Sequence, residues 1–286
     1  MSDPRPIGLF DSGVGGLTVL REVRTRVPRE STLYLGDNAR APYGSRPDTE
    51  VVVLSGECLD WLLGQDVKAV VVACSTSSSV ALDQLRRHST VPVLGIIAPA
   101  AAAAAVATRS GRIGVIATET TVRSGSFPRA IMRERPDADI RAVGTPALVP
   151  LVEAGELDGT HVAGVVRTSL APLSPRGSEP IDTLLLGCTH YPLLGAVIAD
   201  VIGPDVTVID PAAAIAAALA LLLETDGLAA PMDHEPRHLL RTTGDPVLFG
   251  RTAQRLFGGP APAVQSVTLG AIDRAPSPLV SAGASR

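Results

Sequence analysis

Two cysteines in the sequence each stand where a buried strand is expected to end. Cys74 follows the apolar run VKAVVVA, and Cys188 follows IDTLLLG, with a hydroxyl residue within two positions in both cases. A thiol at the carboxyl end of a strand faces the N-terminus of the next helix, where the dipole and free N–H groups stabilise a thiolate. The repeated arrangement predicts two similar half-domains that present a pair of acid/base thiols.

A buried cysteine is more often a small hydrophobic residue without a chemical role. The shared setting of the two cysteines, and His190 beside the second, favour the functional interpretation over that alternative. Ser75, Thr76 and Thr189 are residue types that cap helices, and we expect them to cap the helices that follow the cysteines.

Two further loops follow expected strands on the same side. The stretch FDSGVGGLTVL opens a helix, and its glycine N–H groups suit an anion, with Asp11 and Ser12 at the carboxyl edge of the sheet. The stretch GDNARAPYG carries Asp37, Tyr43 and Gly44 in a loop that could close over a ligand. The alternatives, a tight turn for the first loop and a solvated surface loop for the second, stay open on these residues alone.

Other chemistries fit the sequence poorly. Lys68 is the only lysine among the 25 basic residues, and it stands at the start of its strand, away from the expected site, so a pyridoxal Schiff base and a phosphate-loop lysine are disfavoured. The segment HEPRH resembles a zinc-protease pattern, but Pro236 would interrupt the helix that the pattern needs. We therefore predict no metal and no cofactor, and we expect His88 and His161 to be surface residues.

The elements that must position these residues alternate along the chain. Short apolar runs separated by helix-length segments predict an α/β fold with parallel sheets, and 286 residues favour two domains. The predicted strands are 6–10, 31–36, 67–73, 91–96, 112–117, 139–143, 181–187, 205–209 and 264–269, with buried helices at 98–107 and 212–223. The C-terminal stretch PSPLVSAGASR is expected to be a solvated tail.

Composition narrows the functional classes. A net charge of −4 gives no basic footprint for nucleic acid, and the most apolar run, 212–223, is shorter than a membrane span requires. Three cysteines form no disulfide framework, and the N-terminal residues do not resemble a signal peptide. We expect a cytoplasmic protein that binds neither membrane nor nucleic acid.

Taken together, the motifs resemble those of glutamate racemases. The segments GLFDSGVGGLTVL, LGDNARAPYGSR, VVVACST, ALVPLVEAGELDG, LLLGCTHYPLL and LLRTTGDPVLF occur in the order of that family, from about residue 6 to 270. The resemblance implies two doubly wound, flavodoxin-like domains, which we expect at 1–97 plus 210–286 and at 98–209, with the active site in the cleft between them. It also implies a homodimer and the cofactor-independent racemisation of glutamate, which supplies D-glutamate for peptidoglycan.

The resemblance also implies roles for residues. Cys74 would deprotonate D-glutamate with help from Asp11, and Cys188 would deprotonate L-glutamate with help from His190. The implied substrate contacts are Asp11, Ser12, Tyr43, Gly44, Ser75, Thr76, Thr189 and His190.

One departure from the family pattern keeps alternatives open. The family reads Cys-Asn-Thr where this chain has Cys74-Ser75-Thr76, so a racemase of aspartate or another amino acid is the first alternative. A non-catalytic protein that binds DNA gyrase is the alternative from another class. A cysteine hydrolase that uses Cys188 and His190 is disfavoured, because it leaves the matched Cys74 unexplained.

Overall fold

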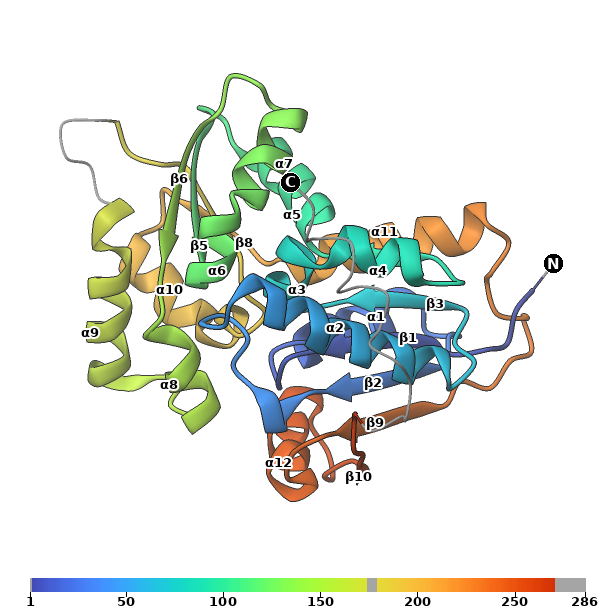
Figure 1. Ribbon diagram of the computed structural model, residues 1–286. Helices are drawn as coiled ribbons and strands as arrows, with labels where there is room; N and C mark the ends of the chain where they lie inside the picture. The colour runs from blue at the N-terminus through green and yellow to red at the C-terminus, as the bar shows by residue number, and fades with distance from the viewer. Residues whose placement is uncertain (1, 174–178, 271–286) are drawn as a thin grey trace.

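The computed structural model describes residues 2–173 and 179–270, which form two parallel sheets (Figure 1). The larger sheet has the strand order β10-β9-β2-β1-β3-β4. The smaller sheet has the order β6-β5-β7-β8, and every pairing in both sheets is parallel. The α/β class with parallel sheets that the sequence predicted is confirmed.

The chain builds most of the larger sheet, crosses to the smaller one and then returns. The larger sheet holds β1 (Ile7–Asp11), β2 (Thr32–Gly36), β3 (Ala69–Val72), β4 (Val93–Gly95), β9 (His238–Thr242) and β10 (Val264–Ser266). The smaller sheet holds β5 (Arg112–Ala117), β6 (Asp139–Gly144), β7 (Thr183–Leu186) and β8 (Thr207–Ile209). The exact domain boundaries stay a prediction.

Helices separate the strands, as crossovers between parallel strands require. Up to the last strand of the smaller sheet they are α1 (Leu17–Arg26), α2 (Asp48–Leu63), α3 (Ser75–Val80), α4 (Leu82–His88), α5 (Ile97–Ala107), α6 (Glu119–Ser124), α7 (Ser126–Glu134), α8 (Leu148–Ala154), α9 (Gly159–Leu170) and α10 (Gly195–Ile202). The last two are α11 (Pro211–Thr225) and α12 (Pro246–Phe257), and short 3₁₀ turns occur at Asn38–Arg40, Ala171–Leu173 and Tyr191–Leu194.

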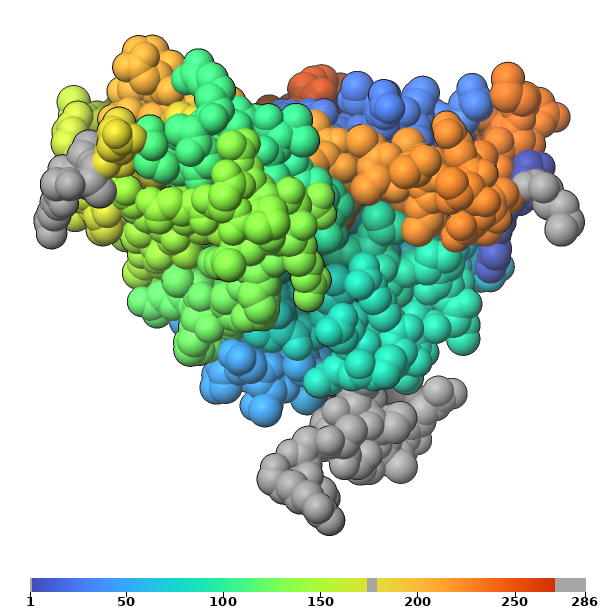
Figure 2. Space-filling model, turned by 90° about the horizontal axis from the view of Figure 1, so that it is seen from above, coloured from blue at the N-terminus to red at the C-terminus, as the bar shows by residue number. Residues whose placement is uncertain are grey.

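Helices α5 and α11 connect the two halves. One continuous apolar cluster contains residues of α1, α5 and α11 together with residues of β5 and α7, so the core runs from one sheet to the other. Helix α11 starts at Pro211 and is capped by Asp210, whose carboxylate accepts from the Ala212 amide at 2.9 Å. Its outer face, orange in Figure 2, lies on the surface, where Leu221 is exposed.

All nine predicted strands are present with ends shifted by up to two residues, except that β10 stops three residues before its predicted end. Strand β9, HLLRT, was not predicted: three of its five residues are polar or charged, and it is recognisable mainly by its pairing with β2. The polar segment that precedes β9 forms no helix, as Pro236 predicted. The predicted C-terminal tail lies outside the described residues.

Several smaller predictions are also decided. Lys68 precedes β3 at the amino edge of the sheet, fully buried, with its ammonium 2.5 Å from Glu30 Oε2. His161 is exposed as expected, but His88 is partly buried and bonds to Asp60 at 2.6 Å. None of the described helices has the length and apolar character needed to cross a membrane.

Candidate active site

Cys74 stands at the carboxyl edge of the larger sheet, two residues after β3. Its sulfur caps α3 by accepting from the Ser77 amide at 3.5 Å, and its thiol donates to Ser12 Oγ at 3.6 Å. The prediction that Ser75 and Thr76 cap this helix was wrong, because the helix begins one residue earlier and both lie inside its first turn. The cysteine itself therefore receives the helix N–H group.

Cys188 occupies the equivalent place two residues after β7 in the smaller sheet. Its Sγ lies 3.7 Å from His190 Nδ1, and His190 Nε2 lies 2.6 Å from Glu153 Oε1. The expectation that Thr189 caps a helix was also wrong. Its hydroxyl instead donates to Asp11 Oδ2 at 3.0 Å, which joins the two sheets at their carboxyl edges.

Asp11, the last residue of β1, is fully buried at this junction. Its other oxygen accepts from the Gly13 amide at 2.9 Å. Burial raises the pKa of the Asp11 carboxyl, although the nearby His190 and the two hydrogen bonds oppose the shift. Asp11, Ser12, Thr189, His190 and both cysteines thus form one connected cluster.

The glycine-rich loop after β1 packs directly against the other half. A Cβ on Gly15 would lie 2.6 Å from Thr189 Oγ1 and 2.7 Å from His190 Nδ1. Only glycine allows the two backbones to approach this closely. The FDSGVGG stretch is therefore more than a turn between a strand and a helix.

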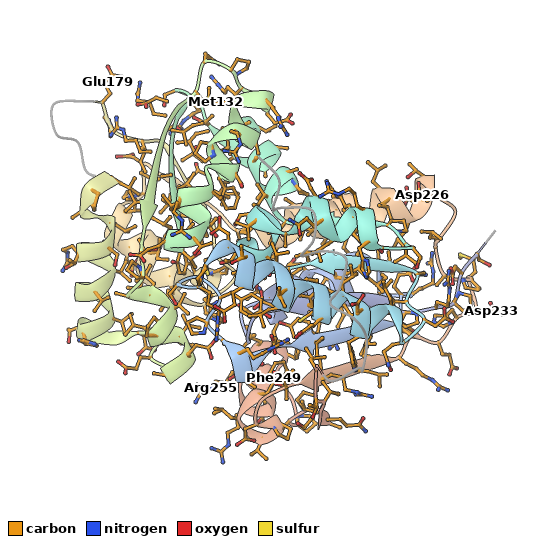
Figure 3. All side chains as sticks on the ribbon, in the orientation of Figure 1. Met132, Glu179, Asp226, Asp233, Phe249 and Arg255 are labelled. Atoms are coloured by element: carbon orange, nitrogen blue, oxygen red, sulfur yellow. The ribbon has the colours of Figure 1, made fainter. Side chains whose placement is uncertain are left out.

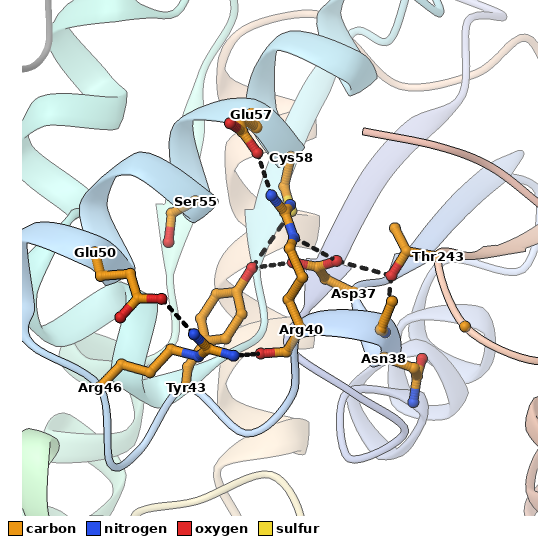
Figure 4. Close-up of polar contacts among 12 residues, drawn as sticks. Asp37, Asn38, Arg40, Tyr43, Arg46, Glu50, Ser55, Glu57, Cys58 and Thr243 are labelled. Carbon is orange, nitrogen blue, oxygen red and sulfur yellow. Dashed lines mark hydrogen bonds and ion pairs between the residues drawn. The ribbon is translucent and has the colours of Figure 1, made fainter. Parts of the chain in front are cut away.

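The second loop, residues 36–44, is anchored by a buried carboxylate. Figure 4 shows Asp37 between three partners: the Tyr43 hydroxyl, which donates to it, Arg40 Nε at 2.8 Å and Thr243 Oγ1 at 2.8 Å. Asp37 and Tyr43 are buried, so the alternative of a solvated surface loop does not hold for them. The Tyr43 hydroxyl is engaged with Asp37, and Tyr43 belongs with Cys74 to one buried apolar cluster.

A chain of threonine hydroxyls closes the site on the Cys74 side. Thr76 Oγ1 lies 3.0 Å from Thr118 Oγ1, which lies 3.0 Å from Thr121 Oγ1. A Cβ on Gly44 would lie 2.6 Å from Thr118, so that loop also touches the smaller sheet. The sequence interpretation missed Thr118 and Thr121, although Thr118 follows the carboxyl end of β5 and the same reasoning could have found it.

Ser75 is the one predicted contact residue whose side chain bonds to nothing among the described residues. Its hydroxyl is buried, and the residue is 2% exposed. A buried hydroxyl without a protein partner is costly, and it can bind a ligand without breaking a contact within the protein.

The pKa values of two groups at the site, the Cys74 thiol and the His190 imidazole, are raised for different reasons. Burial, reinforced by the nearby Asp11 carboxylate, raises the pKa of the Cys74 thiol, against the hydrogen bonds from Ser77 and Ser12. For His190, burial acts to lower the pKa, but the contacts with Cys188 and Glu153 outweigh it and raise the pKa well above the ordinary value. Cys74 is therefore favoured as the thiol, and His190 as the imidazolium beside Cys188.

Other candidate sites are weaker. Among residues 2–173 and 179–270, no cluster of three or more histidines, cysteines or acidic residues could hold a metal ion. A cavity of about 520 Å³ beside Asp3, Arg5 and Asp226 lies near the amino edge of the larger sheet, opposite the cysteines. The third thiol, Cys58, is buried 3.8 Å from the Tyr43 hydroxyl.

Comparison with known proteins agrees with this geometry. A family model described as Asp/Glu/hydantoin racemase matches residues 15–219. A curated glutamate racemase from Exiguobacterium sibiricum is 42% identical over 92% of this chain and 96% of its own length. Among solved structures, a glutamate racemase isoform from Bacillus anthracis superposes with a TM-score of 0.87 at 39% identity, covering 93% of this chain and 98% of that one. The glutamate racemase from Francisella tularensis, solved in complex with D-glutamate, has a TM-score of 0.85 at 29% identity, with coverage of 93% and 98%.

Two parallel α/β sheets with matched cysteines at their facing edges, in a chain this similar to curated racemases, define an amino-acid racemase. More specifically, the chain belongs to the Asp/Glu/hydantoin racemase family, and the relatives named above are glutamate racemases.

Proposed function

We propose that this chain interconverts L- and D-glutamate by a two-cysteine acid/base mechanism without a cofactor. The observation that carries the proposal is the equivalent placement of Cys74 and Cys188, each two residues past a central strand, in halves joined by the Asp11–Thr189 hydrogen bond. Identity of about 42% to a curated glutamate racemase over most of both chains supports glutamate as the substrate.

Racemisation removes the α-proton from one face of the substrate and returns a proton to the other. One thiolate and one thiol on opposite sides meet this need, provided that each has a pKa suited to its task. In the L-to-D direction the Cys188 thiolate takes the α-proton, and the Cys74 thiol donates its proton to the opposite face. The raised pKa of Cys74 and the imidazolium beside Cys188 favour this starting state.

The carbanion-like transition state has no cofactor to spread its charge, so hydrogen-bond donors in a dry site must stabilise it. The unpaired Ser75 hydroxyl is suited to donate to a substrate carboxylate, and the Thr76 hydroxyl can turn from its threonine partners to do the same. The Thr189 hydroxyl donates to Asp11, so its role is to position that carboxylate beside the substrate. All three lie within a few residues of a cysteine and are buried, so water competes little for them.

The reaction would supply D-glutamate for peptidoglycan in the cytoplasm, with a homodimer as the proposed assembly. Incubation with L-glutamate in deuterated water should yield D-glutamate that carries deuterium at Cα. Parallel incubations with aspartate and other amino acids test the substrate assignment. Failure to form D-glutamate at high enzyme concentration rejects the proposal, and faster racemisation of aspartate reassigns the substrate.

A further inference from the structure

A continuous line of titratable side chains leads from Cys188 to the surface. The Cys188 sulfur lies 3.7 Å from His190 Nδ1, and the opposite ring nitrogen lies 2.6 Å from Glu153 Oε1. Cys188 and His190 are nearly inaccessible, at 6% and 4%, whereas about a third of the Glu153 side chain (34%) is exposed. Each member can accept a proton on one side and release it on the other.

Cys74 has no comparable exit among the described residues that contact it. Its hydrogen-bond partners are Ser12 and the Ser77 amide, and the nearest charged group acting on it is Asp11. All three residues are buried, at 6% exposure or less. The two thiols therefore differ in their route to solvent, although they occupy equivalent places in the fold.

This difference matters because the two-cysteine reaction changes the enzyme. If the proposed function holds, each conversion of L- to D-glutamate leaves Cys188 protonated and Cys74 deprotonated. The next conversion in the same direction requires Cys188 to lose that proton and Cys74 to regain one. A buried thiol exchanges protons with water slowly unless neighbouring groups carry them.

We propose that Glu153, acting through His190, carries the Cys188 proton to solvent between turnovers. The His190 imidazolium first passes its Nε2 proton to the Glu153 carboxylate, and Glu153 releases it to water. The ring then rotates so that its unprotonated nitrogen faces Cys188, and the thiol gives its proton to that nitrogen. Cys188 is then a thiolate, His190 is again an imidazolium and Glu153 is again negative. Cys74 regains its proton from water that enters as the product leaves, and the D-to-L direction runs these transfers in reverse.

The surroundings of Glu153 suit this task. Its Oε1 would lie 2.8 Å from a Cβ on Gly13, so the carboxylate sits against the loop that packs on the site. The charged groups facing His190 are Cys188, Glu153 and Asp11. Arg255 reaches from α12 to the end of α8, with Nη1 2.8 Å from where a Cβ on Gly155 would stand, and Figure 3 shows its position. A positive charge therefore lies at the end of the helix that carries Glu153.

The test is the steady-state kinetics of Glu153→Gln in the intact chain. The amide can hold a hydrogen bond to His190, but it cannot take up and release a proton as a carboxylate does. The two thiols return to their starting protonation states after product release and before the next substrate binds. The rate of this step therefore affects kcat but not kcat/KM. We expect kcat to fall about tenfold or more at low buffer concentration, with KM lower by the same factor, on the scale of a lost general acid/base. Added imidazole, at constant ionic strength, should restore kcat by taking over the proton transfer.

Two variants complete the experiment. Glu156→Gln changes an exposed glutamate just beyond the same helix and should leave both constants unchanged. Glu153→Asp keeps a carboxylate and should retain more of kcat than the amide does. A normal kcat in Glu153→Gln overturns the proposal, and so does a fall in kcat/KM that imidazole does not relieve, because Glu153 would then only orient His190. Racemisation by the wild-type enzyme in the same assay separates these outcomes from a failure of the proposed function.

Discussion

Thr189 Oγ1 donates a hydrogen bond to Asp11 Oδ2 at 3.0 Å, and this contact joins the last residue of β1 in the larger sheet to the loop that follows β7 of the smaller sheet. Asp11 ends β1, which lies beside β3, and Thr189 follows Cys188. The contact brings the two cysteine-bearing edges together. It therefore helps to fix the positions of the two thiols relative to each other.

The two cysteines should be individually essential. Cys74→Ala and Cys188→Ala each remove one of the two proton carriers, so kcat for glutamate racemisation should fall at least about 1,000-fold, within the range for a general acid or base. Polarimetry or a coupled D-glutamate assay measures this loss.

Cys58→Ala is the matched control, because it removes the third buried thiol, which lies outside the Asp11–Thr189 cluster. Its racemase activity should stay near that of the wild type. Substantial racemisation by either of the other two variants contradicts the two-thiol mechanism.

Gly15 should tolerate no side chain. Gly15→Ala places a methyl group 2.6 Å from Thr189 Oγ1 and 2.7 Å from His190 Nδ1, so the halves must separate or the loop must shift. We expect a loss of about 1–3 kcal/mol of unfolding free energy, typical of overpacking, together with a fall in kcat/KM. Denaturant unfolding and steady-state kinetics measure the two effects.

The control for Gly15 is Gly164, a glycine in α9 at which an added Cβ would meet nothing within 4 Å. Gly164→Ala should raise the unfolding free energy by about 0.5–1 kcal/mol, since alanine is the better helix former, without changing activity. Equal effects from the two alanines would mean that the Gly15 contact is unimportant.

The sequence was sufficient for features that depend on local pattern. Apolar runs between helices predicted the parallel sheets, and residues after strand ends predicted Cys74, Cys188 and Asp11, because parallel strands share one carboxyl edge. Glu153 lies within a helix rather than at a strand end, and nothing local indicates that it contacts His190.

Features that combine distant segments could not be predicted in this way. The Tyr43 hydroxyl donates to Asp37, which also accepts a hydrogen bond from Thr243, just beyond β9. Sequence alone does not give the register between those segments. Strand β9 was missed for a related reason. Its residues mix polar and apolar types, and the strand is defined by its pairing between β2 and β10.

Stability should fall in mild acid because of His238 at the amino edge of the larger sheet. Partial burial, helped by the nearby Arg24, lowers the pKa of His238 from its ordinary 6.5 to about 4. The unfolded chain therefore binds a proton more readily than the folded one, so this contribution to stability is complete above about pH 6.5 and is lost as the pH falls towards 4.

His238→Gln should flatten the dependence of unfolding free energy on pH between about 6.5 and 4, because glutamine does not titrate. Urea unfolding at several pH values measures the slope. His161→Gln, at an exposed position outside this region, is the control and should leave the slope unchanged. An unaltered slope in His238→Gln means that other groups cause the acid sensitivity.

Ser75 should show opposite effects on stability and on substrate binding. Its hydroxyl is buried and has no partner among the described residues, so Ser75→Ala removes an unsatisfied group and should raise the unfolding free energy by up to about 1–3 kcal/mol. If that hydroxyl bonds to a substrate carboxylate, the same change should raise KM for glutamate about tenfold or more, as expected for a hydrogen bond to a charged group.

Ser55→Ala is the contrasting control, since the Ser55 hydroxyl is also buried but donates to Ser77 Oγ at 2.9 Å. Losing that bond should lower stability and leave KM unchanged. Thermal unfolding with and without glutamate, combined with steady-state kinetics, separates the two serines. A Ser75→Ala protein that is less stable and has a normal KM would show that water satisfies this hydroxyl, and substrate recognition would then rest on the threonines and backbone N–H groups.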